Sequence, residues 1–223
     1  MKKLGLAVGA LLAISTAANA TIISGGTTAY GPAPTDFSGL AVSLAGYDHS
    51  AGNLVGVILT LSGHIDTQYS ASNASAQDGT LDSAQTTSEM TLFFGATGLV
   101  TAIPIASLTG GPYLVPALSG STNYGPLANG NNSDNQQYNT PDPIVTAFDT
   151  LALVNFTVDS DTHTLFGTTG GNVAGGQSTM GSGTVHVDFI VEDTVGSPEP
   201  ASMMLIGGGL TGIAMLLRRR KAA

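Results

Sequence analysis

Hydrophobic and polar positions alternate in short segments along most of this chain. The alternation is clearest in residues 184–192, where a Val or Phe occupies every second position. Because successive side chains of a strand point to opposite faces, this pattern predicts a strand with one buried face and one solvent face. Residues 54–65 show the same pattern, which predicts burial of the odd-numbered apolar residues from Val55 to Leu61. Further strands are predicted at residues 40–44, 67–75, 90–94, 99–105, 151–158 and 164–168.

Turn-forming residues separate these segments, with clear examples at residues 48–53 and 159–161. Residues 67–75 are polar, so we expect them to form an edge strand. No amphipathic helix is predicted between residues 21 and 197. Many short strands joined by Gly-rich turns are typical of an all-β antiparallel β-sandwich, and residues 21–197 have the length of one such domain.

The first 20 residues have the three parts of a secretory signal peptide. Two lysines begin the segment, and an apolar run follows them. Ala18 and Ala20 then place small residues at the two positions that signal peptidase recognises. We therefore expect signal peptidase to remove residues 1–20 and the rest of the chain to be exported.

A second apolar segment, residues 201–217, contains no charged side chain. A helix of this length reaches roughly 25 Å, close to the thickness of the hydrocarbon core of a membrane. Basic residues remain on the cytoplasmic side of a membrane. We therefore expect a transmembrane helix that anchors the precursor in the inner membrane. The stop-transfer cluster that follows it consists of Arg218, Arg219, Arg220 and Lys221.

Pro198, Glu199 and Pro200 stand just before this apolar segment. The order Pro-Glu-Pro, apolar helix and terminal Arg cluster resembles the PEP-CTERM protein-sorting signal, and it assigns residues 198–223 to that signal. The resemblance implies cleavage near the two prolines by exosortase, a membrane-embedded transpeptidase-like enzyme of Gram-negative bacteria. It also implies a mature protein without a membrane span, on the cell surface or in the extracellular polymer.

The start of the exported domain carries a second resemblance. Thr35-Asp36-Phe37-Ser38 is followed by the strand pattern of residues 40–44, by Tyr47-Asp48, and by Leu-Val-Gly-Val-Ile-Leu-Thr-Leu-Ser-Gly at residues 54–63. This order is similar to the opening of the choice-of-anchor E domain. The resemblance implies a surface β domain and supplies no catalytic residues.

The charges of the chain exclude several classes of function. Residues 21–197 contain no Lys or Arg, whereas all 15 acidic residues except Glu199 lie there. Nucleic-acid binders neutralise phosphates with Lys and Arg, so nucleic acid is excluded as a partner. The absence of Cys excludes disulfides and thiolate metal sites. We expect no cofactor, and only weak, diffuse binding of divalent cations by this acidic domain.

Two sets of polar residues are candidates for chemistry. His186 and Asp188 share one face of a predicted strand, and such a pair can serve acid–base catalysis. Because the opposite face is apolar, we favour a solvent-exposed, structural role for this pair. Asp159 and Asp161 in a predicted turn offer oxygen ligands and are a weak Ca²⁺ candidate, although the turn lacks the Gly and Glu of an EF-hand loop.

Residues 129–143 are strongly polar and are predicted to form a long surface loop, where we expect any ligand contacts. Tyr113, Tyr124 and Tyr138 flank this region. Aromatic faces stack on sugars, so these residues are candidate glycan contacts; the alternative is that their rings cap the core.

These observations lead to three functional hypotheses. The first is a non-enzymatic surface or extracellular-matrix protein of a Gram-negative bacterium, sorted by an exosortase and associated with exopolysaccharide or the cell envelope. The second is a glycan-binding adhesin. The third is a polymer-acting hydrolase, for which the sequence contains no nucleophile elbow.

Overall fold

The computed structural model describes residues 20–192, which form an all-β structure. Neighbouring strands in these residues pair antiparallel. In chain order the strands are β1 (Ala20–Pro34), β2 (Leu40–Ala45), β3 (Asn53–Asn73), β4 (Gly79–Phe94), β5 (Thr97–Ala102), β6 (Ile105–Ser107), β7 (Tyr113–Val115), β8 (Ser119–Asn139), β9 (Leu153–Gly170) and β10 (Val173–Glu192). Two short helical segments, η1 (His49–Ala51) and α2 (Pro143–Phe148), complete the described structure.

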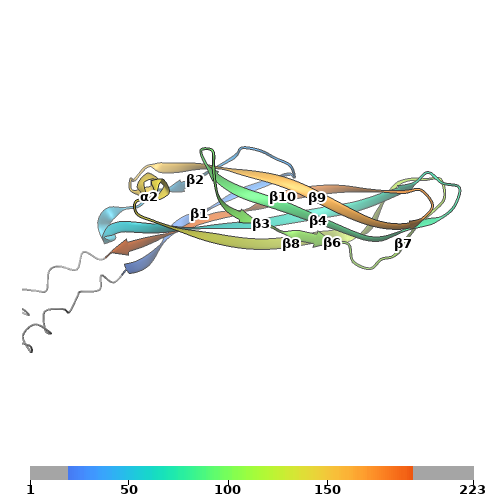
Figure 1. Cartoon of the computed structure of the whole chain (residues 1–223), viewed down its shortest axis with the longest axis horizontal. Coiled ribbons are helices and arrows are strands. Elements are labelled where there is room, and N and C mark those ends of the chain that lie inside the picture. Colours follow the sequence, from blue (N-terminus) through green and yellow to red (C-terminus); the bar gives the residue numbers. More distant parts are fainter. Residues whose placement is uncertain (1–19, 193–223) are drawn as a thin grey trace, which may run out of the picture.

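The strands form two sheets around a shared core, so the predicted β-sandwich is confirmed. Sheet A has the order β1-β10-β3-β8. Sheet B has the order β2-β9-β4-β5, and β6 and β7 pair with other stretches of β4. The strands run along the length of a narrow rod (Figure 1). Because β3 has 21 residues, it reaches about 70 Å at about 3.3 Å per residue.

One end of the rod holds both limits of the described chain. Ala20 pairs with Glu192, and Glu192 also pairs with Asn53 at the start of β3. At the opposite end Val173 pairs with Asn73. We call the end with Ala20 and Glu192 the base, and the end with Asn73 and Val173 the tip.

The alternation in the sequence is confirmed by burial in the two central strands of sheet A. Val185, Val187 and Val191 of β10 have no exposed surface, and the same is true of Val57, Leu59 and Leu61 of β3. The predicted burial of Val55 is wrong, because the pairing with β10 shifts by one residue at this point. Leu54 is buried instead, and Val55 is half-buried.

The polar segments predicted as edges and turns are parts of long strands. Residues 67–75 are not an edge strand: up to Asn73 they continue β3, which lies between β10 and β8. Residues 159–161 are not a turn, because they join two predicted strands into β9. Their polarity is tolerated inside the sandwich because buried hydroxyls pair. Thr67 Oγ1 and Thr179 Oγ1 are 3.0 Å apart, and Ser88 Oγ and Ser160 Oγ are 2.8 Å apart.

The loop predicted at residues 129–143 is also wrong. Residues 129–139 belong to β8 and pair with β3, which satisfies their backbone groups without requiring apolar side chains at the sheet edge. Helix α2 follows, with Asp142 accepting a hydrogen bond from the Ile144 backbone N–H at 2.9 Å. This cap and the buried side chain of Phe148 fix a helix that the sequence pattern did not predict.

Several predictions concern residues outside the described range. These are the predictions for residues 1–19 of the signal peptide, which include Ala18, for the Pro-Glu-Pro motif, and for the transmembrane helix of residues 201–217. Ala20 is described, and it is the exposed first residue of β1. Within residues 20–192, no helix has the length and hydrophobicity needed to cross a membrane.

Candidate functional site

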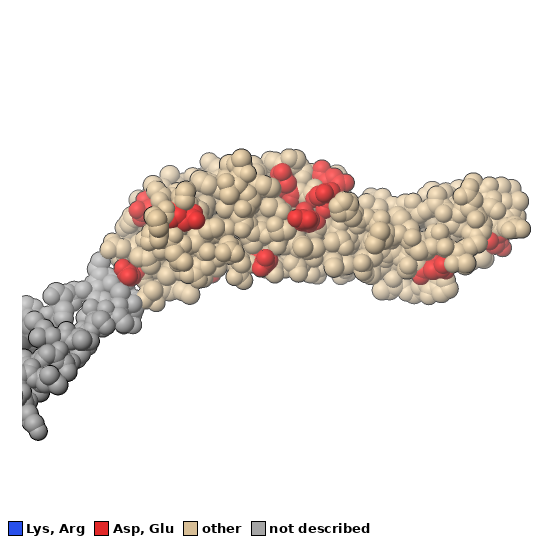
Figure 2. All heavy atoms as spheres, viewed as in Figure 1, with Lys and Arg blue, Asp and Glu red and all other residues tan. Residues whose placement is uncertain are grey.

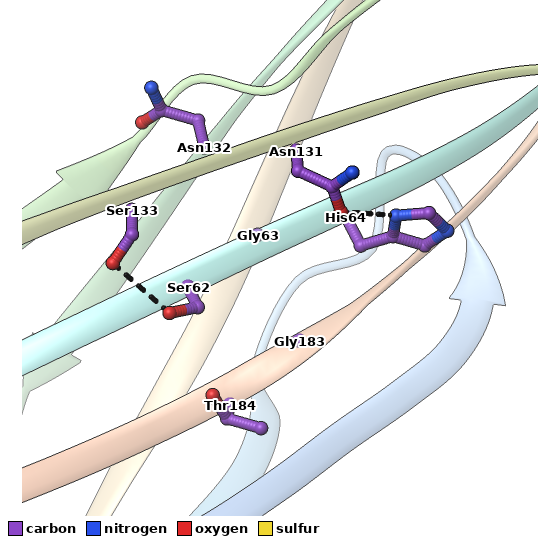
Figure 3. A pocket seen from close by; sticks show the side chains of 8 residues that line it. All are labelled: Ser62, Gly63, His64, Asn131, Asn132, Ser133, Gly183 and Thr184. Atoms are coloured by element: carbon purple, nitrogen blue, oxygen red, sulfur yellow. Dashed lines mark hydrogen bonds between the residues drawn. The ribbon is translucent and has the colours of Figure 1, made fainter.

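The outward face of sheet A carries a shallow polar hollow of about 360 Å³. It lies where β8, β3 and β10 run side by side (Figure 3). The strand register places it roughly midway between base and tip. Its lining contains hydroxyl, amide and imidazole groups but no carboxylate. The lining residues are Ser62, Gly63, His64, Asn131, Asn132, Ser133, Gly183 and Thr184.

The strand register places the polar lining side chains in two rows. Thr184 of β10, Ser62 of β3 and Ser133 of β8 lie opposite one another in the first row. His64 and Asn131 lie opposite one another in the second row. Each row crosses the strands, so the site depends on the exact pairing of three long strands.

Hydrogen bonds join the two sides of the hollow. Ser62 Oγ lies 3.1 Å from Ser133 Oγ. His64 Nδ1 lies 2.6 Å from Asn131 Oδ1, as Figure 3 shows. These contacts hold the outward side chains of β3 and β8 in fixed positions.

Gly63 forms the floor of the hollow, and the core behind it leaves no room for a side chain at this position. A Cβ on Gly63 would lie 2.8 Å from Met90 Sδ and 3.2 Å from Pro104 Cδ, so this position faces the core of the sandwich. The Asn132 side-chain amide also points away from the hollow, because its Oδ1 accepts a hydrogen bond from the Ile103 backbone N–H at 2.9 Å. The ligand-accessible groups are therefore the outward side chains of the two rows.

Ser62, His64 and Asp66 share one face of β3, and these are the residue types of a hydrolytic triad. Their contacts are different from those of a triad. His64 Nε2 lies 3.1 Å from Asp66 Oδ2, and the other ring nitrogen contacts Asn131. The Ser62 hydroxyl contacts Ser133, and no hydrogen bond joins it to the imidazole in the described structure. The arrangement offers fixed hydrogen-bond donors and acceptors rather than an activated serine.

The predicted His186–Asp188 pair is formed, with His186 Nε2 2.9 Å from Asp188 Oδ1. His186 Nδ1 also lies 2.8 Å from Thr27 Oγ1 of β1. Both side chains point to the outward face of β10, as the alternation predicted, and each is 28% exposed. Neither residue lines the hollow.

Asp159 and Asp161 both point outward from β9. Asp159 Oδ1 accepts a hydrogen bond from the Gly39 backbone N–H at 2.6 Å, and Asp161 lies 3.5 Å from His163. Among residues 20–192 there is no group of three or more side chains with metal-ligand chemistry. The structure therefore places these two carboxylates on a strand, in contacts with protein groups, instead of in a Ca²⁺-binding turn.

The three candidate tyrosines are not brought together. The Tyr113 and Tyr124 rings lie 5.9 Å apart near the tip. Tyr138 pairs with Val57, whereas Tyr124 pairs with Tyr69, so they are separated by twelve residues along β3. That is about 40 Å at about 3.3 Å per residue. Burial and the nearby Asp142 raise the pKa of Tyr138, whose hydroxyl donates to the Leu99 carbonyl at 2.7 Å.

Part of the segment predicted to hold ligand contacts, residues 129–143, lies at the hollow. Asn131 and Ser133 do line the hollow, from a strand rather than from a loop. No period of two marks them in the sequence, because Asn132, Asp134 and Gln136 at the even positions are polar as well. The residues from β3 and β10 were missed, since only the register reveals which outward side chains are neighbours.

Comparisons with known proteins identify the C-terminal segment. The family description "PEP-CTERM protein-sorting motif" matches residues 198–221. The chain therefore carries this sorting signal, which indicates a secreted, membrane-anchored precursor that ends on the cell surface and has an exosortase as its processing partner. No curated protein matches the chain.

Solved structures give weak likenesses to the described domain. The crystal structure of the STIV MCP has 11% identity and a TM-score of 0.27, with 77% of this chain and 50% of that chain covered. The structure of the infectious bursal disease virus Gt strain has 11% identity and a TM-score of 0.12, covering 92% of this chain and 50% of that chain. This chain spans about half the length of each, and these TM-scores are too low to assign a fold.

Proposed function

We propose that this chain is a non-enzymatic surface protein of a Gram-negative bacterium, sorted by an exosortase and associated with exopolysaccharide. Signal peptidase acts after Ala20, and the C-terminal helix holds the exported precursor in the inner membrane. Exosortase then cleaves near Pro198 and Pro200 and transfers the β-sandwich to the cell surface or extracellular polymer. The resemblance to choice-of-anchor E domains supports the same role.

The sorting motif at residues 198–221 is the observation that carries this proposal. The fold is compatible with it in one specific way. Glu192, the last described residue, lies at the base of the rod beside Ala20. An attachment a few residues after Glu192 would therefore hold the base, and the rest of the rod, about 70 Å long, would project from it.

The test is the mass of the protein extracted from the cell surface. If exosortase cleaves the chain, the mature form lacks Arg218 to Lys221. This shortened form should be absent in a variant with Pro198→Ala, Glu199→Ala and Pro200→Ala. A matched control replaces Thr194 and Ser197 with Ala, which leaves the motif intact and should be processed normally. A mature surface form that retains Arg218 to Lys221 would refute processing.

A second candidate function is glycan binding at the polar hollow. Its support is a lining of hydroxyl, amide and imidazole side chains, which suits the hydroxyls of a sugar polymer. The test is retention of the chain on purified neutral cell polymer. Thr184→Val with Ser133→Val should reduce retention, whereas Thr122→Val on the tip half of β8 should not. Equal retention of these variants would show that the hollow does not bind the polymer. The triple variant Tyr113→Ala, Tyr124→Ala, Tyr138→Ala tests whether the three tyrosines are the glycan contacts instead.

A further inference from the structure

One edge of β9 is covered near the base and open near the tip. Up to Val158 this edge pairs with β2. The chain before β2 then covers two more positions: the Ser160 N–H donates to the Phe37 carbonyl at 2.8 Å, and the Thr162 N–H donates to Asp36 Oδ1 at 2.7 Å. In the described residues no strand pairs with this side of β9 beyond Thr162.

The open stretch presents regularly spaced backbone groups. Because alternate residues of a strand direct their N–H and C=O groups to the same side, Thr164, Phe166 and Thr168 point these groups away from β4. Residues 164–170 carry no charged side chain and no proline. Proteins commonly protect exposed edges with charges, prolines or bulges, so this edge lacks two of the usual barriers to strand addition.

The side chains of this edge are also unusual. Leu165 points outward from the sheet and is 73% exposed. Two residues further along the same face is Gly167, which has no side chain. A large exposed apolar residue therefore stands on an edge strand close to a glycine, where an added Cβ would lie 2.5 Å from Ser83 Oγ of β4.

We propose that residues 163–169 of β9 bind the same residues of a second copy of this chain, as antiparallel edge strands related by a two-fold axis at Phe166. In this register Thr164 of one copy lies opposite Thr168 of the other. Leu165 then lies opposite Gly167 of the second copy, so each leucine packs over the backbone of the other chain's glycine, beside the Ser83 that pairs with it. The two copies would join sheet B into one continuous sheet.

The same register brings polar groups into complementary positions. His163 lies opposite Thr169 of the second copy. The Thr169 hydroxyl donates to Asp82 Oδ2 in its own chain at 2.6 Å, so the His163 ring comes close to that carboxylate. Both ends of the paired segment therefore place a ring with an N–H donor beside an acidic group.

The distribution of charge favours a second copy as the occupant. The tip part of the rod, built from residues 67–88, 105–128 and 162–180, contains only Asp78 and Asp82 as acidic residues, and Asp66, Glu89 and Asp161 lie just beyond its limit. On the face that Figure 2 shows, the other acidic side chains lie near the middle of the rod and towards the base. Repulsion between two copies is therefore smallest at the tip, whereas a cationic partner would be attracted to the base half. An uncharged edge strand pairs without repulsion with another uncharged strand, and residues 164–170 of a second copy provide such a strand.

Spin labels can test this pairing in the full chain, purified in detergent. The chain contains no Cys, so Leu165→Cys gives a unique labelling site, at which the large apolar nitroxide side chain takes the place of the leucine. Diagonal positions across an antiparallel pair have Cα atoms about 7–8 Å apart, so two labels at this site should lie within roughly 20 Å. The control is Leu151→Cys, which is equally exposed but lies near the base. In the proposed dimer these labels are roughly 100 Å apart and should show no coupling.

A third variant separates edge pairing from other contacts. Thr168→Pro removes an N–H that faces the open edge and leaves the pairing with β4 in place. Added to Leu165→Cys, it should abolish the coupling while circular dichroism and the melting temperature stay close to those of the parent. The proposal is overturned if Leu165 labels show no coupling at any protein concentration, if Leu151 labels couple as strongly, or if the coupling survives Thr168→Pro. None of these measurements depends on exosortase processing.

Discussion

The Tyr30 ring lies over Gly183 on the inner face of sheet A. The two residues are opposite one another in the β1–β10 pair, and a Cβ on Gly183 would overlap the Tyr30 ring and the Ser62 carbonyl. The Tyr30 hydroxyl donates to that carbonyl at 3.0 Å, and the residue is 4% exposed. The glycine is therefore required by an aromatic neighbour, and not by a turn.

We expect Gly183→Ala to lower the free energy of unfolding by about 1–3 kcal/mol, because Tyr30 and the backbone of β3 must move to make room. Urea denaturation measures this change. Gly120→Ala is the matched control, since a Cβ there meets nothing within 4 Å. Equal stability of the two variants would contradict the packing described.

Asn73 ends β3 with four hydrogen bonds and is 1% exposed. Its Nδ2 donates to the Gln77 and Val115 carbonyls at 2.8 and 3.2 Å, and its Oδ1 accepts from the Ser75 and Asn172 N–H groups at 2.9 and 3.1 Å. Asn73→Ala removes the side-chain partner of the buried Val115 carbonyl and of three part-buried backbone groups.

Asn73→Ala should therefore cost about 2–3 kcal/mol of unfolding free energy, measured by urea denaturation. The exposed Asn123 of β8 provides the comparison, and its replacement by Ala should change stability by less than about 0.5 kcal/mol. A similar small loss for Asn73→Ala would show that the turn at the tip does not depend on this side chain.

Glu89 of β4 lies directly opposite Asp161 of β9. Like charges at opposing positions destabilise a sheet, and no Lys or Arg is present in residues 21–197 to offset them. Glu89→Gln should raise the melting temperature, and the gain should shrink at high salt because the repulsion is screened. Glu192→Gln should have a smaller effect, since Glu192 faces Ala20 and Asn53. A gain that does not depend on salt would exclude this repulsion as its cause.

Hydrogen bonds from Thr169 and Thr80 hold the pKa of Asp82 below the usual aspartate value. A depressed pKa in the folded state means that its stabilising contribution is complete above the unfolded pKa, near 4, and is lost as the pH falls through the folded pKa. NMR titration of the Asp82 carboxyl should show the low value. Thr169→Val should raise it toward normal, and an unchanged titration would show that the Thr169 hydroxyl has no such effect.

The strands with strict alternation could be predicted because burial alone decides their faces. Residues 185–191 are an example of a strand predicted from its alternation. Helix α2, in contrast, could not be predicted from the sequence pattern. Its six residues are too few for a periodic pattern, and it is stabilised by the Asp142 cap and by the burial of Phe148 against the core. A tertiary contact of this kind has no local signal.

The polar strands were missed for a different physical reason. Thr67 and Ser160 look like edge or turn residues because a hydroxyl is normally left in water. In the fold each meets a second hydroxyl on the neighbouring strand of its own sheet, and that partner is more than 70 residues away in the sequence. The hollow depends in the same way on strand pairing that places Ser62, Ser133 and Thr184 side by side. The sequence shows that these residues are polar, but it does not show that they are neighbours.

The adjacency of Ala20 and Glu192 has a mechanical consequence. A load between the C-terminal attachment and anything bound at the tip acts parallel to the strands, so many ladder hydrogen bonds resist it together in shear. A load between the two termini acts across the β1–β10 ladder and would open its hydrogen bonds one pair at a time. A protein held at its base and pulled at its far end is therefore loaded in the direction in which its long sheets are strongest.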